Sequence, residues 1–439
     1  MRLTARITRI AAGVLTSLLV AAPAYAQEAA APAADSGDTA WVLMSTALVL
    51  LMTAPGLALF YGGLVSRKNV LSTLMHSFFT ICLVGVQWVL IGYTVAFGSD
   101  KGGILGGLDF LGLSGVGMAP NGAATVPHLA FAIFQGVFAI ITVALITGAF
   151  AERMKFGAYV LFSLLWATLV YGPLAHWVWG GGWLQKLGAL DFAGGLVVHI
   201  SSGVSALVAA VMVGKRYAKP THPHNIPYVM IGGGLLFFGW LGFNGGSALG
   251  ANGLAALAVA TTFTSGAAGG LLWTLFEWNH RRKPSLIGTV SGVVAGLVGI
   301  TPAAGYVSIP AALAIGATTA VVCYLGVNKV KAYFGYDDAL DVFGVHGLGG
   351  IWGALSTGLF ASSAINPAGA DGLIFGNAAL LGAQAVSVLA AVAFSVAGTF
   401  LILKVVSAVT ALRASQEEEQ AGLDRVLHGE VAYTKAQET

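Results

Sequence analysis

A succession of long apolar stretches constrains this chain more than any other feature of its sequence. A helix of about 20 apolar residues is long enough to cross a lipid bilayer, and eleven stretches come near to this length or exceed it. They occupy residues 41–61, 71–97, 129–150, 158–179, 192–213, 228–249, 254–278, 286–301, 309–327, 345–360 and 378–405. The stretches at 286–301 and 345–360 are short, so they could be tilted or sheltered by neighbouring helices. The sequence therefore predicts an all-α polytopic membrane protein with eleven transmembrane helices.

The composition excludes most soluble functions. Charged residues make up 9% of the chain, against about 25% in an ordinary soluble domain, which argues against a cytoplasmic enzyme. Lys and Arg total 21 against 18 for Asp and Glu, so no basic surplus points to nucleic acid. Cys82 and Cys323 lie inside apolar stretches and are expected to be small core residues. We therefore predict no disulfide framework, no catalytic site, no cofactor and no bound metal.

The N-terminal residues have the pattern of an export signal. A basic region with three arginines precedes an apolar run at 10–20 and an A-x-A-like cleavage motif, Ala24-Tyr25-Ala26. The run is too short to span a bilayer, so we predict a signal peptide at 1–26, with an uncleaved first helix as the alternative. The rest of the chain is then expected to form a short outer tail at 27–40, a membrane domain at 41–405 and a cytoplasmic tail at 406–439.

The basic residues of the loops predict the orientation of the chain, because cytoplasmic loops of membrane proteins are enriched in Lys and Arg. With the N-terminus outside, the outer loops carry Lys101 and Lys186. The inner loops carry twelve basic residues: Arg67, Lys68, Arg153, Lys155, Lys215, Arg216, Lys219, Arg281, Arg282, Lys283, Lys329 and Lys331. This asymmetry predicts an N-terminus outside and, because the number of spans is odd, a C-terminus in the cytoplasm.

Two histidines interrupt apolar stretches. His199 lies in the fifth stretch and His346 at the start of the tenth, and each follows an aspartate by eight residues, Asp191 and Asp338. The matching spacing, five stretches apart, suggests an inverted repeat in which stretches one to five and six to ten are related by a pseudo-two-fold axis in the membrane plane. Equivalent histidines of such a repeat would meet near the middle of the membrane.

The histidine pair is a candidate functional site, because ionisable groups inside a membrane are costly and usually functional. A neutral imidazole has one hydrogen-bond donor and one acceptor, and it titrates near physiological pH. Two touching imidazoles can share a proton, pass one along, or hydrogen-bond a small polar solute. The alternative is that each histidine forms a structural hydrogen bond between helices. Metal binding is not expected, because neither histidine has a Cys or carboxylate beside it at helical spacing.

A second group of candidates lies at the outer ends of the stretches. Phe134 and Phe138 share one helical face, Trp179 ends the fourth stretch, and Ser247 follows Phe243 by four residues. If these side chains converge, they form an aromatic cup with one hydroxyl acceptor, which suits a small monovalent cation held by cation–π attraction. The alternatives are an interfacial aromatic belt for Trp179 and core or lipid packing for the phenylalanines.

Seven long strings carry a family resemblance over nearly the whole chain from about Trp41 onward. They are FYGGLVSRKNVLS, GAFAERMKFGAYV, GALDFAGGLVVHI, GWLGFNGGSA, KPSLIGTVSGVVAGLVGITPAAGYV, DVFGVHGLGGIWGAL and the tail segment GLDRVLHGEVAY. These strings resemble the signatures of the ammonium transporter (Amt/Mep/Rh) family. The bacterial Amt branch fits better than the Rh branch, because Trp179 and the signal peptide both belong to its pattern.

The resemblance implies a fold of eleven helices with an inverted five-plus-five repeat, and a homotrimer with one conduction path per subunit. It also implies roles for individual residues: an outer recruitment site of Phe134, Phe138, Trp179 and Ser247, a stacked phenyl gate of Phe138 and Phe243, and twin pore histidines, His199 and His346. Asp191 matches a family acid that holds the shape of the outer site without binding the substrate. That role agrees with its interpretation as the N-cap of the helix that starts at residue 192.

The function implied by the resemblance is ammonium or ammonia transport across the cytoplasmic membrane, which in bacteria is the inner membrane. Ammonium would be recruited at the outer site, deprotonated, and conducted as ammonia past the twin histidines, with separate proton transfer. Two alternatives are an ammonium sensor or receptor of the same fold, and a membrane redox protein that uses His199 and His346 as haem ligands.

The tail is the remaining feature with a predicted role. The acidic run Glu417 to Glu419 could be a solvated helix end. The segment GLDRVLHGEVAY instead resembles a family segment that packs against the cytoplasmic pore mouth, where PII-type nitrogen-signalling proteins dock. We therefore expect the tail to order against the inner loops, with basic partners such as Arg67, Lys68, Arg153 and Lys155.

Overall fold

The computed structural model describes residues 33–121, 124–217 and 222–433. The predicted signal peptide and residues 27–32 of the predicted outer tail lie outside these ranges. Within them the chain is mostly helical. One short antiparallel hairpin pairs β1 (Asp100–Lys101) with β2 (Leu105–Gly106).

Many of the helices are joined end to end through short 3₁₀ or π-helical turns, labelled η. The helices up to residue 213 are α2 (Ser36–Leu51), η1 (Met52–Leu57), α3 (Ala58–Leu64), η2 (Arg67–Asn69), α4 (Val70–Gln87), η3 (Trp88–Gly92), α5 (Tyr93–Phe97), η4 (Leu111–Leu113), α6 (His128–Ile146), η5 (Thr147–Phe150), α7 (Phe156–Trp166), η6 (Ala167–Tyr171), α8 (Gly172–Trp179), α9 (Trp183–Lys186), η7 (Gly195–Ile200) and α10 (Ser201–Val213). The later helices are α11 (Ile226–Gly246), α12 (Gly253–Arg281), α13 (Leu286–Ile300), α14 (Ile309–Leu325), η8 (Gly326–Val330), α15 (Lys331–Phe334), η9 (Phe343–Gly347), α16 (Leu348–Phe360), η10 (Leu373–Phe375), α17 (Ala378–Val409), α18 (Gln416–Ala421) and α19 (Leu423–His428).

Nine helical segments of the described chain are long and apolar enough to cross a membrane. They are Ser36–Leu64, Arg67–Phe97, His128–Phe150, Phe156–Lys186, Gly195–Val213, Ile226–Gly246, Gly253–Arg281, Ile309–Phe334 and Ala378–Val409. The two stretches that the sequence marks as short contain α13, with 15 residues, and α16, with 13 residues. Both are sheltered, because α13 packs against α11, α12 and α14, and α16 packs against α13, α14 and α17. A mostly helical, polytopic membrane protein is therefore confirmed.

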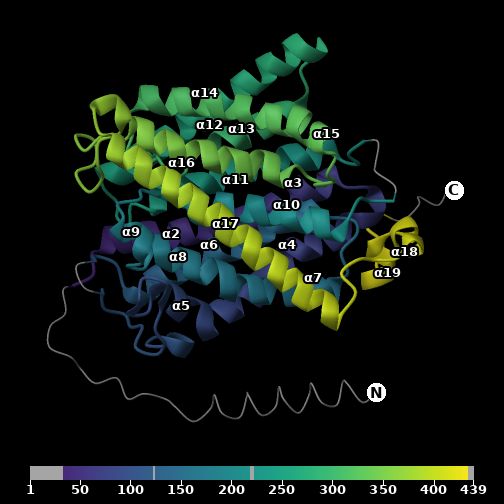
Figure 1. Ribbon diagram of the computed structural model, residues 1–439, viewed down its shortest axis with the longest axis horizontal. Helices are drawn as coiled ribbons and strands as arrows, with labels where there is room; N and C mark the ends of the chain where they lie inside the picture. The colour runs from purple at the N-terminus through teal and green to yellow at the C-terminus, as the bar shows by residue number, and fades with distance from the viewer. Residues whose placement is uncertain (1–32, 122–123, 218–221, 434–439) are drawn as a thin grey trace. The chain divides into compact units, whose positions relative to one another are not determined.

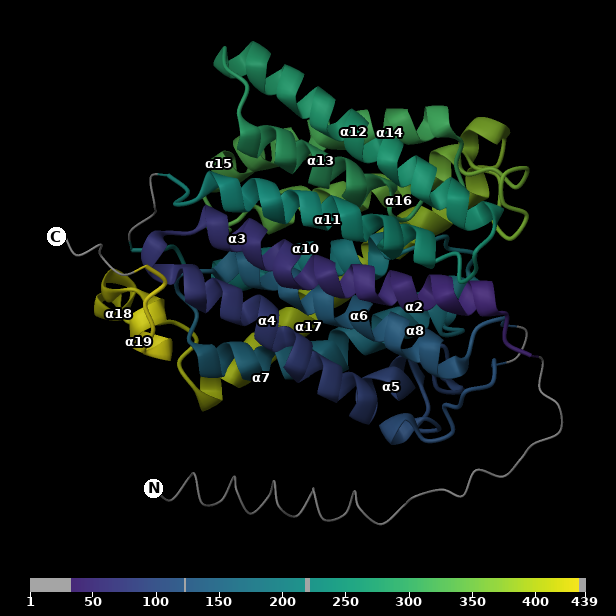
Figure 2. The same cartoon turned by 180° about the vertical axis from the view of Figure 1, so that it is seen from behind.

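The long helices lie side by side (Figures 1 and 2), with α10 and α11 between the early helices α2, α4 and α6 and the later helices α12, α13 and α14. The helix α9 and the pair α18 and α19 lie at opposite ends of these helices (Figure 1). Lys186 at the end of α9 pairs with Asp100 of the hairpin, at 2.6 Å. We call this end the hairpin end, and the end that holds α18 and α19 the tail end.

Side-chain caps begin several of the long helices. A Ser, Asn or Asp side chain before a helix accepts a hydrogen bond from one of the first backbone N–H groups, which have no partner within the helix. The structure has such caps at Asp35, Asn225, Asn252, Ser285, Ser308 and Asn377. Five of these six residues lie just before apolar stretches, so the sequence itself marks where most of these helices begin. Asp35 instead precedes the polar residues of the first turn of α2.

A cluster of buried charges lies at the tail end. Arg153 Nη1 is 3.0 Å from Asp337 Oδ2, and neither side chain is exposed. Arg216 bridges Asp337 and Glu152, at 2.8 and 2.7 Å. Burial by itself would raise the pKa of Asp337, but the hydrogen bonds and charge of Arg216, together with the charge of Arg153, lower this pKa well below its ordinary value. Burial also lowers the pKa of Arg153, to about 10. The cluster joins three separate loops at the tail end.

The helix α19 packs back onto the start of α4. The Asp424 carboxylate accepts hydrogen bonds from the backbone N–H groups of Leu71 and Ser72, at 3.0 and 2.7 Å. The N–H of Leu423 donates to the side-chain oxygen of Asn69, at 2.8 Å. Asp424 therefore supplies the negative cap that the N-terminus of α4 lacks in its own sequence.

Two residues of the acidic run, Glu418 and Glu419, also contact the rest of the protein, whereas Glu417 is exposed. These contacts contradict the alternative of a wholly solvated end. Glu419 is buried and pairs with Arg413 at 2.7 Å. Lys155 lies 3.5 Å from Glu418, as expected for a basic partner. Arg153 does not fulfil that expectation, because its guanidinium belongs to the buried cluster and only its backbone carbonyl reaches the tail.

We expect Arg153→Met to destabilise the protein by about 3–5 kcal/mol, because it removes one partner of a fully buried ion pair and leaves the other partner with an incomplete set of contacts. The matched control is Lys283→Met, in which the lysine is exposed and forms no ion pair among the described residues. An exposed cation of this kind contributes less than about 1 kcal/mol. Thermal unfolding of both variants in detergent measures the difference. Equal unfolding midpoints for both variants would contradict a structural role for the cluster.

Candidate functional site

The structure brings the two histidines of the apolar stretches into direct contact. His199 lies in η7 and His346 in η9, each within a π-helical turn. Their Nδ1 atoms are 3.2 Å apart, and their rings are nearly parallel with centroids 5.3 Å apart. One Nδ1 atom donates and the other accepts, so the contact contains one shared proton. The two residues are 1% and 5% exposed. A proton can therefore be held between the two rings without contact with bulk water.

Glycines allow the histidine-bearing segments to approach this closely. A Cβ atom on Gly203 would lie 2.1 Å from the backbone nitrogen of Gly347, the residue after His346. A Cβ atom on Gly350 would lie 3.0 Å from the Cβ of His199. Small residues permit backbones to touch in this way inside a membrane. The imidazole contact thus depends on positions that carry no side chain.

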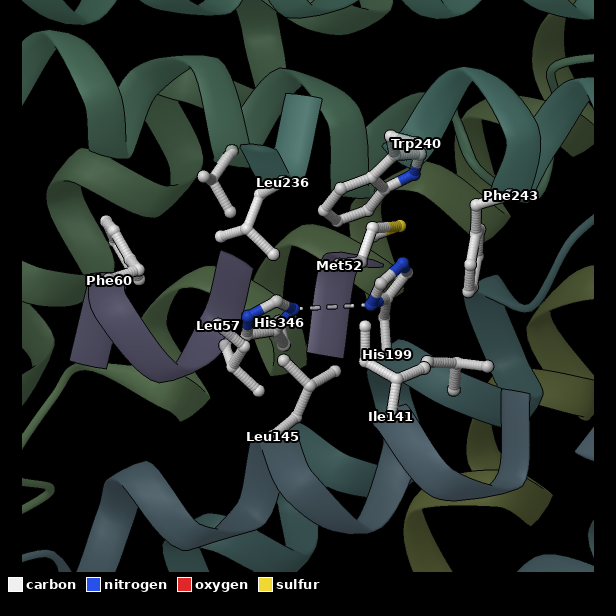
Figure 3. Close-up of a pocket in the computed structure, with 12 residues that line it drawn as sticks. Met52, Leu57, Phe60, Ile141, Leu145, His199, Leu236, Trp240, Phe243 and His346 are labelled. Atoms are coloured by element: carbon white, nitrogen blue, oxygen red, sulfur yellow. Dashed lines mark hydrogen bonds between the residues drawn. The ribbon is translucent and has the colours of Figure 1, made fainter. Parts of the chain in front are cut away.

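The histidine pair lies in a narrow, mostly apolar cavity (Figure 3). Its other lining residues are Met52, Leu57, Phe60, Ile141, Leu145, Val198, Leu236, Trp240, Phe243 and Val294. The cavity has a volume of about 10 Å³, room for roughly one molecule of the size of water. His199 Nε2 is buried and has no hydrogen-bond partner among the described residues. This nitrogen is therefore available to a small polar molecule.

Two phenylalanine rings separate the histidine cavity from a second cavity towards the hairpin end. Phe138 and Phe243 stack with centroids 4.1 Å apart and an interplanar angle of 22°. Phe243 lines the histidine cavity, and Phe138 lines the second cavity. Because the rings are in contact, at least one of them must turn aside before a molecule can pass.

The second cavity has a volume of about 190 Å³ and includes three of the predicted recruitment residues, Phe138, Trp179 and Ser247. Its other lining residues are Phe97, Phe131, Gln135, Gln185, Phe192 and Leu249. Ser247 Oγ donates to the carbonyl of Phe243, at 2.8 Å, which leaves its lone pairs free to accept a hydrogen bond. Trp179 meets Phe138 edge to face, with centroids 6.2 Å apart. The cavity thus combines aromatic faces with a hydroxyl acceptor.

Phe134, the fourth predicted recruitment residue, is not among the residues that line this cavity. Its side chain is fully buried and packs edge to face against Phe138, with centroids 5.0 Å apart. Phe131, three residues earlier on α6, lines the cavity. Any effect of Phe134 on a bound molecule would therefore act through Phe138.

Asp191 holds the first turn of the segment that carries His199. Its two carboxylate oxygens accept four backbone N–H groups at 2.6–3.2 Å, those of Gly194, Gly195, Leu196 and Val197. The helical turn begins at Gly195 and not at residue 192 as predicted, because Gly194 adopts a left-handed turn with φ 115°. Asp191 therefore caps the helix from a position several residues before it. Its backbone carbonyl also accepts the indole N–H of Trp179, at 2.8 Å.

A third cavity continues from the histidines towards the tail end. It has a volume of about 70 Å³ and shares Phe60, Val294 and His346 with the histidine cavity. Its polar lining includes Ser291 and Asp341. The three cavities therefore follow one another through the molecule, with the phenylalanine stack and the histidine pair between them.

Several residues that line these cavities were not predicted from the sequence, among them Trp240, Gln135 and Asp341. Trp240 stacks on the His199 ring with centroids 5.3 Å apart. It precedes Phe243 by three residues on α11, so a shared helical face was a usable signal. Gln135 likewise precedes Phe138 by three residues on α6. Asp341 has no such signal, because its cavity is built from helices far apart in the sequence.

Comparisons with known proteins agree on one family. Residues 40–433 match the model of the Ammonium Transporter Family. An ammonium transporter of Bacillus subtilis (strain 168) is 55% identical over 399 residues, which cover 90% of this chain and 98% of that protein. Ammonium transporter Amt1 of Archaeoglobus fulgidus is 46% identical and covers 91% of this chain and 100% of its own length.

Solved structures are similar over the same range. The crystal structure of Saccharomyces cerevisiae Mep2 matches with a TM-score of 0.85 at 37% identity, covering 93% of this chain and 94% of that chain. A sensor Amt protein matches with a TM-score of 0.83 at 29% identity, covering 89% of this chain and 98% of that chain. Because the family model and these relatives span nearly all of the described residues, the chain belongs to the ammonium transporter family.

Proposed function

We propose that this protein transports ammonium across the membrane by binding it at the hairpin-end cavity and passing it on as ammonia beside His199 and His346. The observation that carries the proposal is the contact of two imidazoles, at 3.2 Å, in a cavity with room for about one small molecule. Relatives named ammonium transporters support the choice of substrate. The alternative of a structural hydrogen bond leaves the unpartnered His199 Nε2 without an explanation.

Recruitment would rely on the aromatic cavity. Trp179 and Phe138 present rings to a cation, and a cation–π contact contributes about 0.5–2 kcal/mol, with the larger values where water is excluded. Ser247 can accept a hydrogen bond from ammonium, which potassium cannot donate. The lining of this cavity includes no carboxylate. A weakly held monovalent cation suits such a site better than a divalent one.

Selectivity would arise at the phenylalanine stack and beyond it. A bare monovalent ion pays several kcal/mol to enter an apolar segment of a membrane protein. Ammonium can leave its proton behind and cross as neutral ammonia, which still hydrogen-bonds the imidazoles. Potassium has a similar size and the same charge but has no neutral form. The proton would travel separately along the histidine pair, so that net transport moves charge.

We further propose the topology expected from the sequence, with eleven spans, an inverted five-plus-five repeat, the N-terminus outside and the C-terminus in the cytoplasm. Two aspartates with equivalent spacing support the repeat. Asp191 caps the turn that carries His199, and Asp338 accepts a hydrogen bond from the N–H of Phe343, the first residue of η9, at 2.8 Å. The tail end carries the basic loops, which supports its cytoplasmic location.

Assembly and regulation are proposed on the same family basis. A homotrimer with one path per subunit and a PII-type protein that docks at the tail end are the partners that the resemblance implies. The packed tail supports a regulatory role for this end, because Asp424 connects α19 directly to α4. The second hypothesis for the function is an ammonium sensor without transport, and a solved sensor Amt protein shares the fold. The hypothesis of a redox protein with haem between His199 and His346 is disfavoured, because the two imidazoles are in direct contact and leave no space for a porphyrin.

We expect His199→Ala and His346→Ala each to change selectivity and not only rate. Removing an imidazole widens the narrow cavity and admits water, which lowers the cost of an ion in the path. Ammonium, and to a lesser extent potassium, should then cross as ions. Currents and fluxes measured together on proteoliposomes test this, with His280→Ala, at the end of α12, as the control. If both histidine variants keep wild-type ammonium currents and still exclude potassium, the proposed transfer of a proton along the histidine pair is refuted.

We expect Trp179→Leu to raise the half-saturation concentration of ammonium by about 2- to 30-fold, the factor that corresponds to a cation–π contact of 0.5–2 kcal/mol. The effect should be largest at low substrate, where binding limits flux. Trp177→Leu is the matched control, because Trp177 lies on the same helix but packs against Trp183 and Phe394. An unchanged half-saturation concentration in Trp179→Leu would favour the alternative that Trp179 belongs to an interfacial aromatic belt.

We expect truncation after Ala414 to lower flux without preventing membrane insertion, because every long apolar helix precedes this point. The truncation removes the Asp424 cap from α4. Truncation after Tyr433 retains these contacts and is the control. Flux in proteoliposomes, compared at equal amounts of inserted protein, is the measurement. Full flux in the shorter form, together with no binding of a PII-type protein to the intact form, would show that the tail has no regulatory role.

A further inference from the structure

A fully buried glutamine, Gln384, lies on the last long helix, α17. This helix crosses the other long helices obliquely (Figure 1) and packs against α10, α16 and η7, the turn that carries His199. It corresponds to the eleventh apolar stretch, so the proposed five-plus-five repeat does not include it. Burying a neutral amide costs free energy unless its hydrogen-bonding groups find partners. The partners of Gln384 therefore indicate what this position contributes.

The Gln384 amide holds the backbone of Leu190, which lies 194 residues earlier in the chain. Its Oε1 accepts the N–H of Leu190 at 2.8 Å, and its Nε2 donates to the carbonyl of Leu190, also at 2.8 Å. Nε2 donates as well to the carbonyl of Ala354 in α16, at 3.0 Å. Leu190 belongs to no helix or strand, so regular secondary structure supplies no partner for its backbone groups. Gln384 is therefore a clamp whose amide matches donor with acceptor at all three contacts in one orientation only.

Leu190 directly precedes Asp191, which contacts two parts of the path. The carbonyl of Leu190 belongs to the rigid peptide unit that ends at the Cα atom of Asp191. The carbonyl of Asp191 in turn accepts the indole N–H of Trp179 at 2.8 Å, and its carboxylate caps the first turn of η7. A displacement of the clamped peptide unit would therefore move the Trp179 indole, which lines the hairpin-end cavity.

We propose that Gln384 is a positioning residue for the recruitment of ammonium: through the backbone of Leu190 and Asp191, it fixes the indole of Trp179. The inference rests on the proposed function, in which Trp179 faces the bound cation. Gln384 lines none of the three cavities of the path, so it acts without touching the transported molecule. A cation–π contact weakens when the ring moves away from the cation. Loss of the clamp should therefore impair the binding of ammonium more than the later steps of transport.

Gln384→Met tests the proposal, because it keeps the length of the side chain and removes all three hydrogen bonds. In proteoliposomes the half-saturation concentration of ammonium should rise by about three- to tenfold, because the indole loses part of its cation–π contact. The maximal flux per inserted protein should change by less than about twofold, since Asp191 still caps η7. Thr399→Val is the matched control, because Thr399 lies on the same helix and donates to Ser205 of α10, at 2.7 Å. It should keep the wild-type half-saturation concentration.

A double variant separates a positioning role from a general effect on the fold. Trp179→Leu combined with Gln384→Met should have the half-saturation concentration of Trp179→Leu alone, because the clamp acts through the indole. Gln384→Glu keeps an acceptor for the N–H of Leu190 but lacks the amide donor, so its value should lie between those of the wild type and Gln384→Met. Gln384→Glu also carries the test if Gln384→Met does not insert into the membrane.

Hydrogen–deuterium exchange of the purified full-length protein in detergent gives a readout that does not require transport. Peptides that cover Leu190 should exchange about tenfold faster in Gln384→Met, because the N–H of Leu190 loses its acceptor. Peptides of α10 should exchange as in the wild type, and Thr399→Val should leave the exchange at Leu190 unchanged.

Unchanged exchange at Leu190 in Gln384→Met would overturn the proposal. So would an unchanged half-saturation concentration in this variant, or effects of Gln384→Met and Trp179→Leu that add in the double variant. A wild type without ammonium flux would refute the proposed function itself, and the recruitment role with it. The failure of the positioning role alone is therefore distinguishable from the failure of the proposed function.

Discussion

The cost of placing charge in an apolar cavity governs the design of this protein. The histidine cavity is lined by aliphatic and aromatic side chains, and its polar groups are the imidazoles of His199 and His346 and the indole of Trp240. In such surroundings an ion without hydrogen bonds is strongly disfavoured. Two imidazoles in contact provide hydrogen bonds to a neutral molecule without introducing a permanent charge. The proposed selection by the loss of a proton relies on this arrangement.

The structure around the two imidazoles holds both rings in place. Inside a bilayer, backbone groups must find their partners within the protein. Asp191 satisfies four of them at the start of η7, and Gly203 and Gly347 let the two histidine-bearing segments touch. Trp240 then covers the His199 ring as a flat wall. Asp191, Gly203 and Gly347 thus fix the geometry of the site, whereas Trp240 also lines the histidine cavity.

A continuous series of polar contacts connects the tail to the loop that precedes η9. The N–H of Leu423 donates to Asn69, whose amide donates to Glu152. Glu152 pairs with Arg216, and Arg216 pairs with Asp337. Because these groups are largely buried, changing one member alters the charge balance of its neighbours. This series provides a physical route by which a protein bound at the tail end could influence the segment that carries His346.

The class of this protein and the candidates for its site can be recognised in the amino-acid sequence alone. Hydropathy is a local property, so the apolar stretches and the aspartate–histidine spacing are visible without a structure, as is the acidic tail. The resemblance of long strings to one family supplied the roles of Phe138, Trp179 and Ser247. Local pattern also marked the stretch at 286–301 as short, and it forms the short helix α13.

Which of these residues meet depends on the packing of the helices in three dimensions. The contact of His199 with His346 joins positions 147 residues apart, and the late start of η7 depends on a left-handed turn at Gly194. Phe134 shares a helical face with Phe138 but lies behind it, because packing against other helices and not periodicity decides which ring faces the cavity. Asp424 capping α4 is likewise invisible in the sequence of either segment. Such contacts depend on how the helices pack in three dimensions. A pattern along the sequence does not state which distant segments come within contact distance of one another.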